Sequence, residues 1–163
     1  GACAAPWGFY NKFFMYEPSI RVPMAVRYPR LIKPGTVSEQ PALNLDLAPT
    51  VLEIAGLKVP EWMQGRSLIP LTKGTQVPDW RKDWLYEFYE WPDSAPKCRG
   101  VRTEQYKLIH YYEAPEEFEL YDLKADPGEL HDLSGNPQYD SIAAKLRERI
   151  KQLRVQTGDV YKG

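Results

Sequence analysis

A lysine near the start of the chain is followed closely by a glutamate, an arginine and a proline. Lys12 lies four residues before the pair Tyr16-Glu17, and Arg21 and Pro23 come next. A lysine ammonium is a compact cation with three hydrogen-bond donors, so it can neutralise charge that collects on the oxygens of an anion. Glu17 and Arg21 are four residues apart and could act as an acid and an anion clamp, or could hold the segment in place.

A second group of candidate site residues lies later in the chain. Arg99 and Arg102 precede an aromatic run that contains His110, and the three side chains could reach a substrate cleft between two domains. Packing within a strand is the alternative for His110. The spacing of His110 and His131 indicates neither a Ser-His-Asp triad nor a set of metal ligands.

Four acidic residues that lie close together in the sequence are candidate ligands for a cation. They lack the alternating spacing of a calcium loop, so we predict that they serve in turns and helix caps and that the chain carries no metal site. These residues are Asp122, Asp126, Glu129 and Asp132.

The elements that must position these residues differ between the two halves of the chain. In the first half, residues 23–28 predict a short strand, and a helix is predicted from an N-cap at Asp46 to Gly56, with Pro49 in its first turn. The apolar side of that helix would consist of Leu47, Val51, Leu52 and Ile54. Such a strand and helix are typical of a larger α/β layer, and residues 72–83 read as a linker after it.

The second half predicts a small antiparallel sheet and a helix. Aromatic and β-branched residues at 84–91, 100–103, 106–112 and 118–123 indicate three or four strands. A helix is predicted over 139–156, and it should pack across the sheet. Its apolar stripe would consist of Ile142, Leu146, Ile150 and Leu153.

Composition limits the function classes. The chain has 163 residues, of which 43% are hydrophobic and 13% aromatic, enough for one buried core. The net charge of −1 gives no basic face for nucleic acid and no polybasic membrane anchor, and no apolar run approaches the roughly 20 residues of a membrane span. Two distant cysteines make no disulfide framework.

The sequence begins at Gly1 without a methionine or a leader, so we expect the natural start upstream. The oligomeric state is not predicted.

The segment around Lys12 resembles the sulfatase family, whose members carry a lysine four residues before a similar Tyr-Glu pair. Residues 44–50, 65–68 and 119–129 are similar to further sulfatase segments and occur in the same order. The resemblance implies that Lys12 contacts the substrate's sulfate and that Glu17 and Arg21 are structural. It also implies a fold class: the end of an alkaline-phosphatase-like α/β domain in residues 1–75, followed in 76–163 by an antiparallel sheet subdomain covered by a C-terminal helix.

Two features of intact sulfatases are missing from this sequence. The motif whose first residue becomes formylglycine has proline and arginine at set offsets, which neither Cys3 nor Cys98 has, and the acidic calcium cluster is absent. The resemblance therefore implies calcium and formylglycine in the full-length enzyme, with none bound by this chain, which alone would be inactive. The implied substrate is a sulfated carbohydrate or an aryl sulfate, and the implied location is periplasmic, secreted or lysosomal.

Two other functions stay open. The chain could be a non-catalytic carbohydrate-binding or structural module, or part of a phosphoester hydrolase of the same fold. Sequence upstream of Gly1 would separate these alternatives. We also expect residues from about 80 onward to be the stable part, because a strand at 23–28 would lack its sheet.

Overall fold

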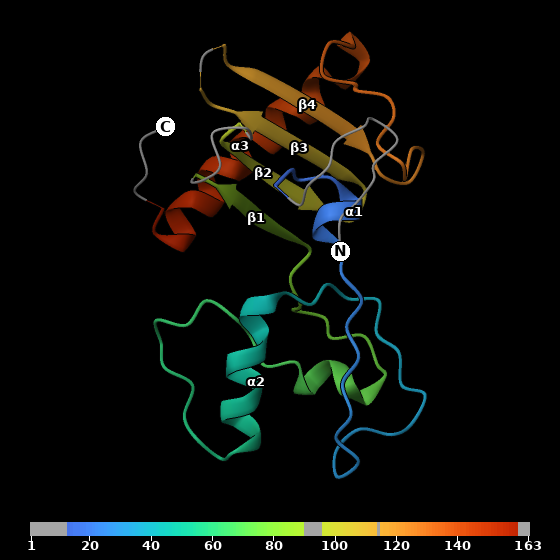
Figure 1. Cartoon of the computed structure of the whole chain (residues 1–163), viewed down its shortest axis with the longest axis vertical. Helices are drawn as coiled ribbons and strands as arrows, with labels where there is room; N and C mark the ends of the chain where they lie inside the picture. Colours follow the sequence, from blue (N-terminus) through green and yellow to red (C-terminus); the bar gives the residue numbers. More distant parts are fainter. Residues whose placement is uncertain (1–12, 90–95, 114, 160–163) are drawn as a thin grey trace. The chain divides into compact units, whose positions relative to one another are not determined.

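Four short segments rich in aromatic and β-branched residues pair into one antiparallel sheet (Figure 1). The computed structural model describes residues 13–89, 96–113 and 115–159. The strands are β1 (Asp83–Phe88), β2 (Cys98–Thr103), β3 (Tyr106–Tyr111) and β4 (Glu117–Asp122). Each strand pairs with the next along the chain. The prediction of three or four antiparallel strands is confirmed.

The chain divides into two units. The first, here called the sheet unit, combines Gly1–Pro23 with Asp83–Gly163, and the second, the central unit, is Met24–Lys82. Residues 13–23 therefore pack with the sheet, although the central unit separates the two in sequence. A domain boundary near residue 75 stays a prediction.

The helix α3 (Asp140–Thr157) covers one face of the sheet, as predicted. It follows the short turn η3 (Pro137–Tyr139) and ends at Gly158, whose positive φ of 72° closes the last turn. Ile142 of the predicted stripe is only partly buried, and Ala143 takes a core position beside it. The core on this face consists of Val101, Leu108, Leu120, Ala143, Leu146, Ile150 and Leu153.

The opposite face of the sheet is covered by the first described residues, which the sequence did not predict. In Figure 1, α1 (Glu17–Ile20) and α3 lie on opposite sides of the sheet. Met15, just before α1, is fully buried at the centre of this second core. The other buried members are Cys98, Ile109, Tyr111, Tyr121 and Leu123. Both faces of the sheet are therefore closed by apolar packing.

Gly100 of β2 makes the close approach of Met15 possible. A Cβ atom at residue 100 would collide with the Met15 sulfur and would lie 2.7 Å from the backbone oxygen of Leu108. Only glycine, which has no Cβ atom, leaves room for the Met15 side chain at this position of β2.

The central unit is built from short elements. They are η1 (Asn44–Asp46), α2 (Leu47–Ile54) and η2 (Ile69–Lys73). The predicted helix is present, with Pro49 in its first turn, and Gly56 lies just beyond its end at a φ of 71°. The buried apolar cluster is small and contains Leu68, Leu71 and Trp80.

Asp46 holds the central unit together, but it does so differently from the prediction. Its side chain makes no cap hydrogen bond to α2. Instead the buried carboxylate accepts from the backbone N–H groups of Leu43 and Arg66, both at 2.8 Å, and pairs with the guanidinium of Arg81. Trp80 packs beside this group and donates its indole N–H to Pro41 at 2.7 Å. The predicted linker at 72–83 thus contains residues that close the central unit.

The strand predicted at 23–28 is absent: residues 21–28 form neither a helix nor a strand. The four described strands pair only with each other, so this segment has no ladder partner. Its apolar side chains Val22, Met24 and Val26 are exposed, as are Leu47, Val51 and Ile54 on the predicted apolar side of α2. Among the described residues, no helix combines the length and apolar character needed to cross a membrane.

Candidate functional site

The segment that follows Lys12 is anchored on the sheet by several contacts. Lys12 itself lies outside the described residues, which begin at Phe13. The ring of Phe13 packs 5.7 Å from that of Phe88, and its backbone oxygen accepts from the hydroxyl of Tyr86 at 3.5 Å. Residue 13 is therefore tied to β1 directly after the candidate lysine.

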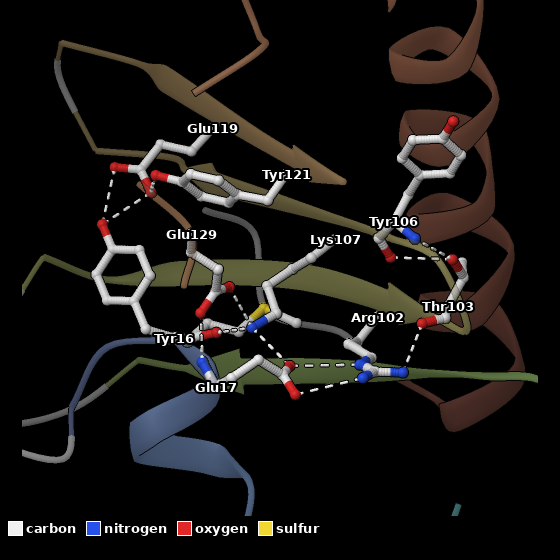
Figure 2. A network of polar contacts seen from close by, with 10 residues as sticks. Tyr16, Glu17, Arg102, Thr103, Tyr106, Lys107, Glu119, Tyr121 and Glu129 are labelled. Carbon is white, nitrogen blue, oxygen red and sulfur yellow. Dashed lines mark hydrogen bonds and ion pairs between the residues drawn. The ribbon is translucent and has the colours of Figure 1, made fainter. Parts of the chain in front are cut away.

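Tyr16, the first residue of the Tyr-Glu pair, is fixed by a partly buried carboxylate on β4. Its hydroxyl donates to Glu119 at 2.9 Å, and the hydroxyl of Tyr121 donates to the same carboxylate at 3.0 Å (Figure 2). Burial raises the pKa of Glu119, against the effect of these two hydrogen bonds. Burial and the nearby Glu119 charge raise the pKa of Tyr16 to about 12, so its hydroxyl stays a donor near neutral pH.

Glu17, the second residue of the pair, enters a network of four charged side chains (Figure 2). Its carboxylate lies 2.9 Å from the ammonium of Lys107 and 3.3 Å from the guanidinium of Arg102. The backbone N–H of Glu17 donates to Glu129 at 2.6 Å. Glu129 also binds Lys107 at 2.6 Å, and both side chains are fully buried. Two carboxylates thus balance two cations beneath the segment.

Burial and the neighbouring charges leave the two acids of this network with pKa values shifted in opposite directions. For Glu17, burial alone would raise the pKa, but the charge of Lys107 and the hydrogen bonds from Arg102 and Lys107 lower it. For Glu129, burial dominates and raises the pKa despite Lys107. Glu17 is therefore the acid that the network holds ionised most strongly.

Glu129 reaches this position from a strained backbone. Its φ of 54° is in the left-handed region that residues other than glycine rarely adopt, and its N–H closes a turn onto the Asp126 oxygen at 3.1 Å. A conformation of this kind persists where the surroundings fix it, here through Lys107 and the backbone of Glu17.

The other three acids considered with Glu129 have the predicted turn duties. Asp122 accepts from the N–H groups of Lys124 and Ala125, and Asp126 from that of His131. Asp132 accepts from the N–H groups of Leu120 and Ser134. The prediction is confirmed for these three residues, whereas Glu129 makes a buried ion pair instead.

The predicted substrate-binding residues separate onto the two faces of the sheet. Arg99 and His110 are direct partners in the β2–β3 register, so their side chains share the α3 face. Arg99 is only 1% exposed, and its guanidinium lies 3.4 Å from Asp159. His110 stacks on Phe118 with ring centroids 4.3 Å apart, and burial lowers its pKa.

Arg102 lies on the other face, where it binds Glu17 and sits over the ring of Trp84 at 5.2 Å. The structure therefore brings Arg99 and His110 together and joins Arg102 to the anchored segment. A role of the three in substrate binding stays a prediction.

Sequence reasoning missed Lys107 and assigned Glu129 to a turn. One signal for Lys107 was available, because it is two residues from Ile109 and four from Tyr111 and so shares with them the face of β3 that points to the core. A lysine at an inward position of a strand requires a buried acid, but sequence alone does not identify which one.

The described residues offer neither a metal centre nor an activated thiol. Within residues 13–89, 96–113 and 115–159, no three His, Cys, Asp or Glu side chains are grouped to hold a metal ion. Burial raises the pKa of the Cys98 thiol to about 12, so this residue stays protonated.

Comparison with known proteins identifies the chain's relatives. A family model described as "N-sulphoglucosamine sulphohydrolase, C-terminal" matches residues 5–156. An N-acetylglucosamine-6-O-sulfatase of Bacteroides thetaiotaomicron is 42% identical over 159 residues, which are 95% of this chain and 28% of that protein.

Two solved structures resemble the fold closely. One, of a protein in complex with its substrate D-glucosamine-2-N,6-O-disulfate, has a TM-score of 0.88 and 39% identity, covering 94% of this chain and 32% of the other. The phosphonate monoester hydrolase of Silicibacter pomeroyi has a TM-score of 0.80 and 25% identity, covering 91% and 31%. The likeness agrees with the predicted alkaline-phosphatase-like fold class. The chain spans less than a third of the length of these relatives.

Proposed function

Because the chain belongs to the N-sulphoglucosamine sulphohydrolase C-terminal family, we propose that it is the C-terminal part of a sulfatase that hydrolyses sulfate esters of carbohydrates. One observation carries the proposal. The chain matches, over at least 94% of its length, both a curated N-acetylglucosamine-6-O-sulfatase and a structure solved with a disulfated glucosamine. A glucosamine unit that carries a 6-O-sulfate is therefore the proposed substrate class.

Lys12 is the proposed sulfate-contacting residue. Its ammonium would neutralise charge on the sulfate oxygens while the ester bond breaks. The support is its place in the sequence, directly before the segment that Glu119, Glu129 and Lys107 fix on the sheet. A cation that acts on a small anion must be held accurately, and an anchored segment provides that.

Calcium and formylglycine are part of the proposal for the longer protein only. Calcium would neutralise the sulfate and formylglycine would supply the nucleophile. The described residues do not fit either group: no acidic cluster is arranged for a cation, and the Cys98 thiol is buried and protonated. We assign both to residues outside this sequence and derive no step through them.

A second candidate is the hydrolysis of a phosphonate or phosphate monoester. The likeness to the phosphonate monoester hydrolase favours it, although identity is lower than to the sulfatase relatives. A non-catalytic carbohydrate-binding module is the third possibility.

The test is an assay of the protein translated from the natural start of its gene. Sulfate release from 6-O-sulfated N-acetylglucosamine would be measured with calcium present, beside a phosphonate monoester and an aryl sulfate, for the wild type and Lys12→Ala. We expect sulfate release from the sugar and a loss of at least about 10²-fold in kcat/KM in the variant, as for removal of a group that stabilises transition-state charge. Turnover of the phosphonate alone would favour the second candidate, and binding of the sugar without turnover the third.

A further inference from the structure

Lys107 uses its whole hydrogen-bonding capacity inside the protein. An ammonium has three donors, and the Lys107 nitrogen lies 2.7 Å from the backbone oxygen of Met15, 2.6 Å from Glu129 and 2.9 Å from Glu17. The side chain is fully buried. With no donor left and no exposure to solvent, Lys107 can affect a ligand only through the residues that it holds.

The atoms that the Lys107–Glu129 pair holds belong to one backbone segment. Lys107 binds the oxygen of Met15, and Glu129 binds the N–H of Glu17, so the pair grips the chain on both sides of Tyr16 (Figure 2). Figure 2 shows the Glu129 carboxylate between the Lys107 ammonium and the start of α1. The grip fixes the direction in which the chain enters α1.

Stability alone does not account for a buried pair at this place. Ions lose their hydration when buried, and a well-packed apolar pair of similar volume is often at least as stabilising. The surrounding face of the sheet is apolar and would accept such a pair, since Ile109 and Tyr111 of the same strand pack there with Met15. What an apolar pair could not supply is the directional bond to each of the two backbone atoms.

The gripped segment is continuous with Lys12. Phe13 is held against β1, and consecutive Cα atoms are about 3.8 Å apart. A shift of residues 13–17 on the sheet therefore displaces the attachment point of Lys12. Misplacement of a reacting group by about 1 Å can lower the rate about 10²-fold.

We propose that Lys107 and Glu129 are positioning residues for Lys12: the buried pair sets the backbone of residues 13–17, which directly follow the sulfate-contacting lysine in the sequence. The inference rests on the proposed function, because it gives Lys12 its role. It adds that the C-terminal sheet contributes to the chemistry through two residues that do not touch the substrate.

The test is a double-mutant cycle in the protein translated from its natural start. kcat and KM for the sulfated sugar would be measured for the wild type, Glu129→Gln, Lys12→Ala and the combination. The glutamine keeps the shape of Glu129 but can no longer accept from both Lys107 and Glu17. We expect Glu129→Gln to lower kcat/KM between about 10-fold and 10²-fold in the wild type and to have almost no effect once Lys12 is alanine.

A matched control separates positioning from loss of stability. Leu146→Ala weakens the same sheet from the α3 face and touches nothing on the Met15 face. At a temperature where both variants are folded, it should leave kcat/KM near the wild-type value. An equal loss in Leu146→Ala, or a Glu129→Gln loss that persists in full in the Lys12→Ala background, would overturn the inference.

A second variant covers the case in which Glu129→Gln does not fold. Lys107→Met combined with Glu129→Gln removes the buried charges together, leaves Arg102 to pair with Glu17, and should keep the melting temperature close to that of the wild type. We expect it to be folded and at least about 10-fold less active; wild-type activity would contradict the inference. If Lys12→Ala has no effect on the wild type while sulfate is released, the proposed role of Lys12 fails. If the cycle is additive, only the positioning role fails.

Discussion

The sheet unit and the central unit bury their side chains in different ways. The sheet unit has apolar cores on both faces and a charge-balanced network beneath α1. The central unit has one small apolar cluster and depends on the Asp46 carboxylate, which gathers two backbone N–H groups and Arg81. Several other apolar side chains of this unit are exposed, as with Val51 at 64% and Trp62 at 77% exposure. The sheet unit therefore completes its own apolar core, whereas the central unit leaves apolar side chains exposed.

Limited proteolysis should show the largest contrast between the two units. We expect cleavage within residues 24–82 at least about tenfold faster than within 96–159, which requires a difference of only 1.4 kcal/mol in the free energy of local opening. Mass spectrometry of a digestion time course would measure both rates. After the first cuts, the peptide that contains residues 13–23 should remain bound to the sheet, because Lys107, Glu119 and Glu129 hold it. Early loss of residues 96–159 with an intact central unit would reverse the comparison.

Lys107→Met should destabilise the sheet unit by about 3–5 kcal/mol, because it leaves the buried Glu129 carboxylate without its cation. Urea unfolding followed by tryptophan fluorescence would measure the loss. Lys124→Met is the matched control, since Lys124 is exposed and pairs with the exposed Glu104. The control should change the free energy of unfolding by less than about 1 kcal/mol. Equal effects of the two substitutions would mean that the network contributes no more than a surface pair.

Gly100→Ala should cost about 2–3 kcal/mol, because the new methyl group collides with the Met15 sulfur and approaches the fixed backbone oxygen of Leu108. The same urea experiment would measure it, with Gly135→Ala as the control, where a Cβ meets no atom within 4 Å. The control should change stability by no more than about 1 kcal/mol. An unchanged midpoint in Gly100→Ala would show that Met15 does not seal this face in solution.

The sequence predicted the part of the fold that depends on local patterns. Four strands and α3 follow from aromatic runs and from a stripe that repeats with helical period, so they were placed to within a few residues. The strand at 23–28 was wrong because a strand needs a partner, and none of the described strands pairs with it. Local pattern cannot report a partner that lies elsewhere.

The anchoring network was only partly predictable for a similar reason. Tyr16 and Glu17 were recognised in a family-like segment, but their partners Glu119, Lys107 and Glu129 come from distant positions in the chain. Met15 can cover the second face of the sheet only because residue 100 is glycine. This role of Gly100 is visible only once the Met15 segment and β2 are placed together. A single sequence indicates such long-range contacts only weakly. The signals here are a lysine at an inward position of a strand and a glycine inside a strand.

The smallest expected effect is a change in how stability depends on pH. Burial raises the pKa of Glu119 above its ordinary value of 4.5, so the folded state binds this proton more tightly than the unfolded state. Stability from this group therefore falls as the pH rises from 4.5 through the raised pKa. Glu17 acts in the opposite sense: its pKa is lowered, so its contribution is present above 4.5 and is lost as the pH falls through the lowered value.

Glu119→Gln should therefore flatten the pH dependence above 4.5 and leave the acid side unchanged. The glutamine oxygen can still accept from Tyr16, so the segment keeps part of its anchor. Urea midpoints between pH 3.5 and 7.5 would measure the slope, and Glu117→Gln on the exposed end of β4 is the control. Curves for Glu119→Gln and the wild type that run parallel above pH 4.5 would rule out Glu119 as the source of the slope. The comparison of units would then rest on apolar packing and the Lys107 network alone.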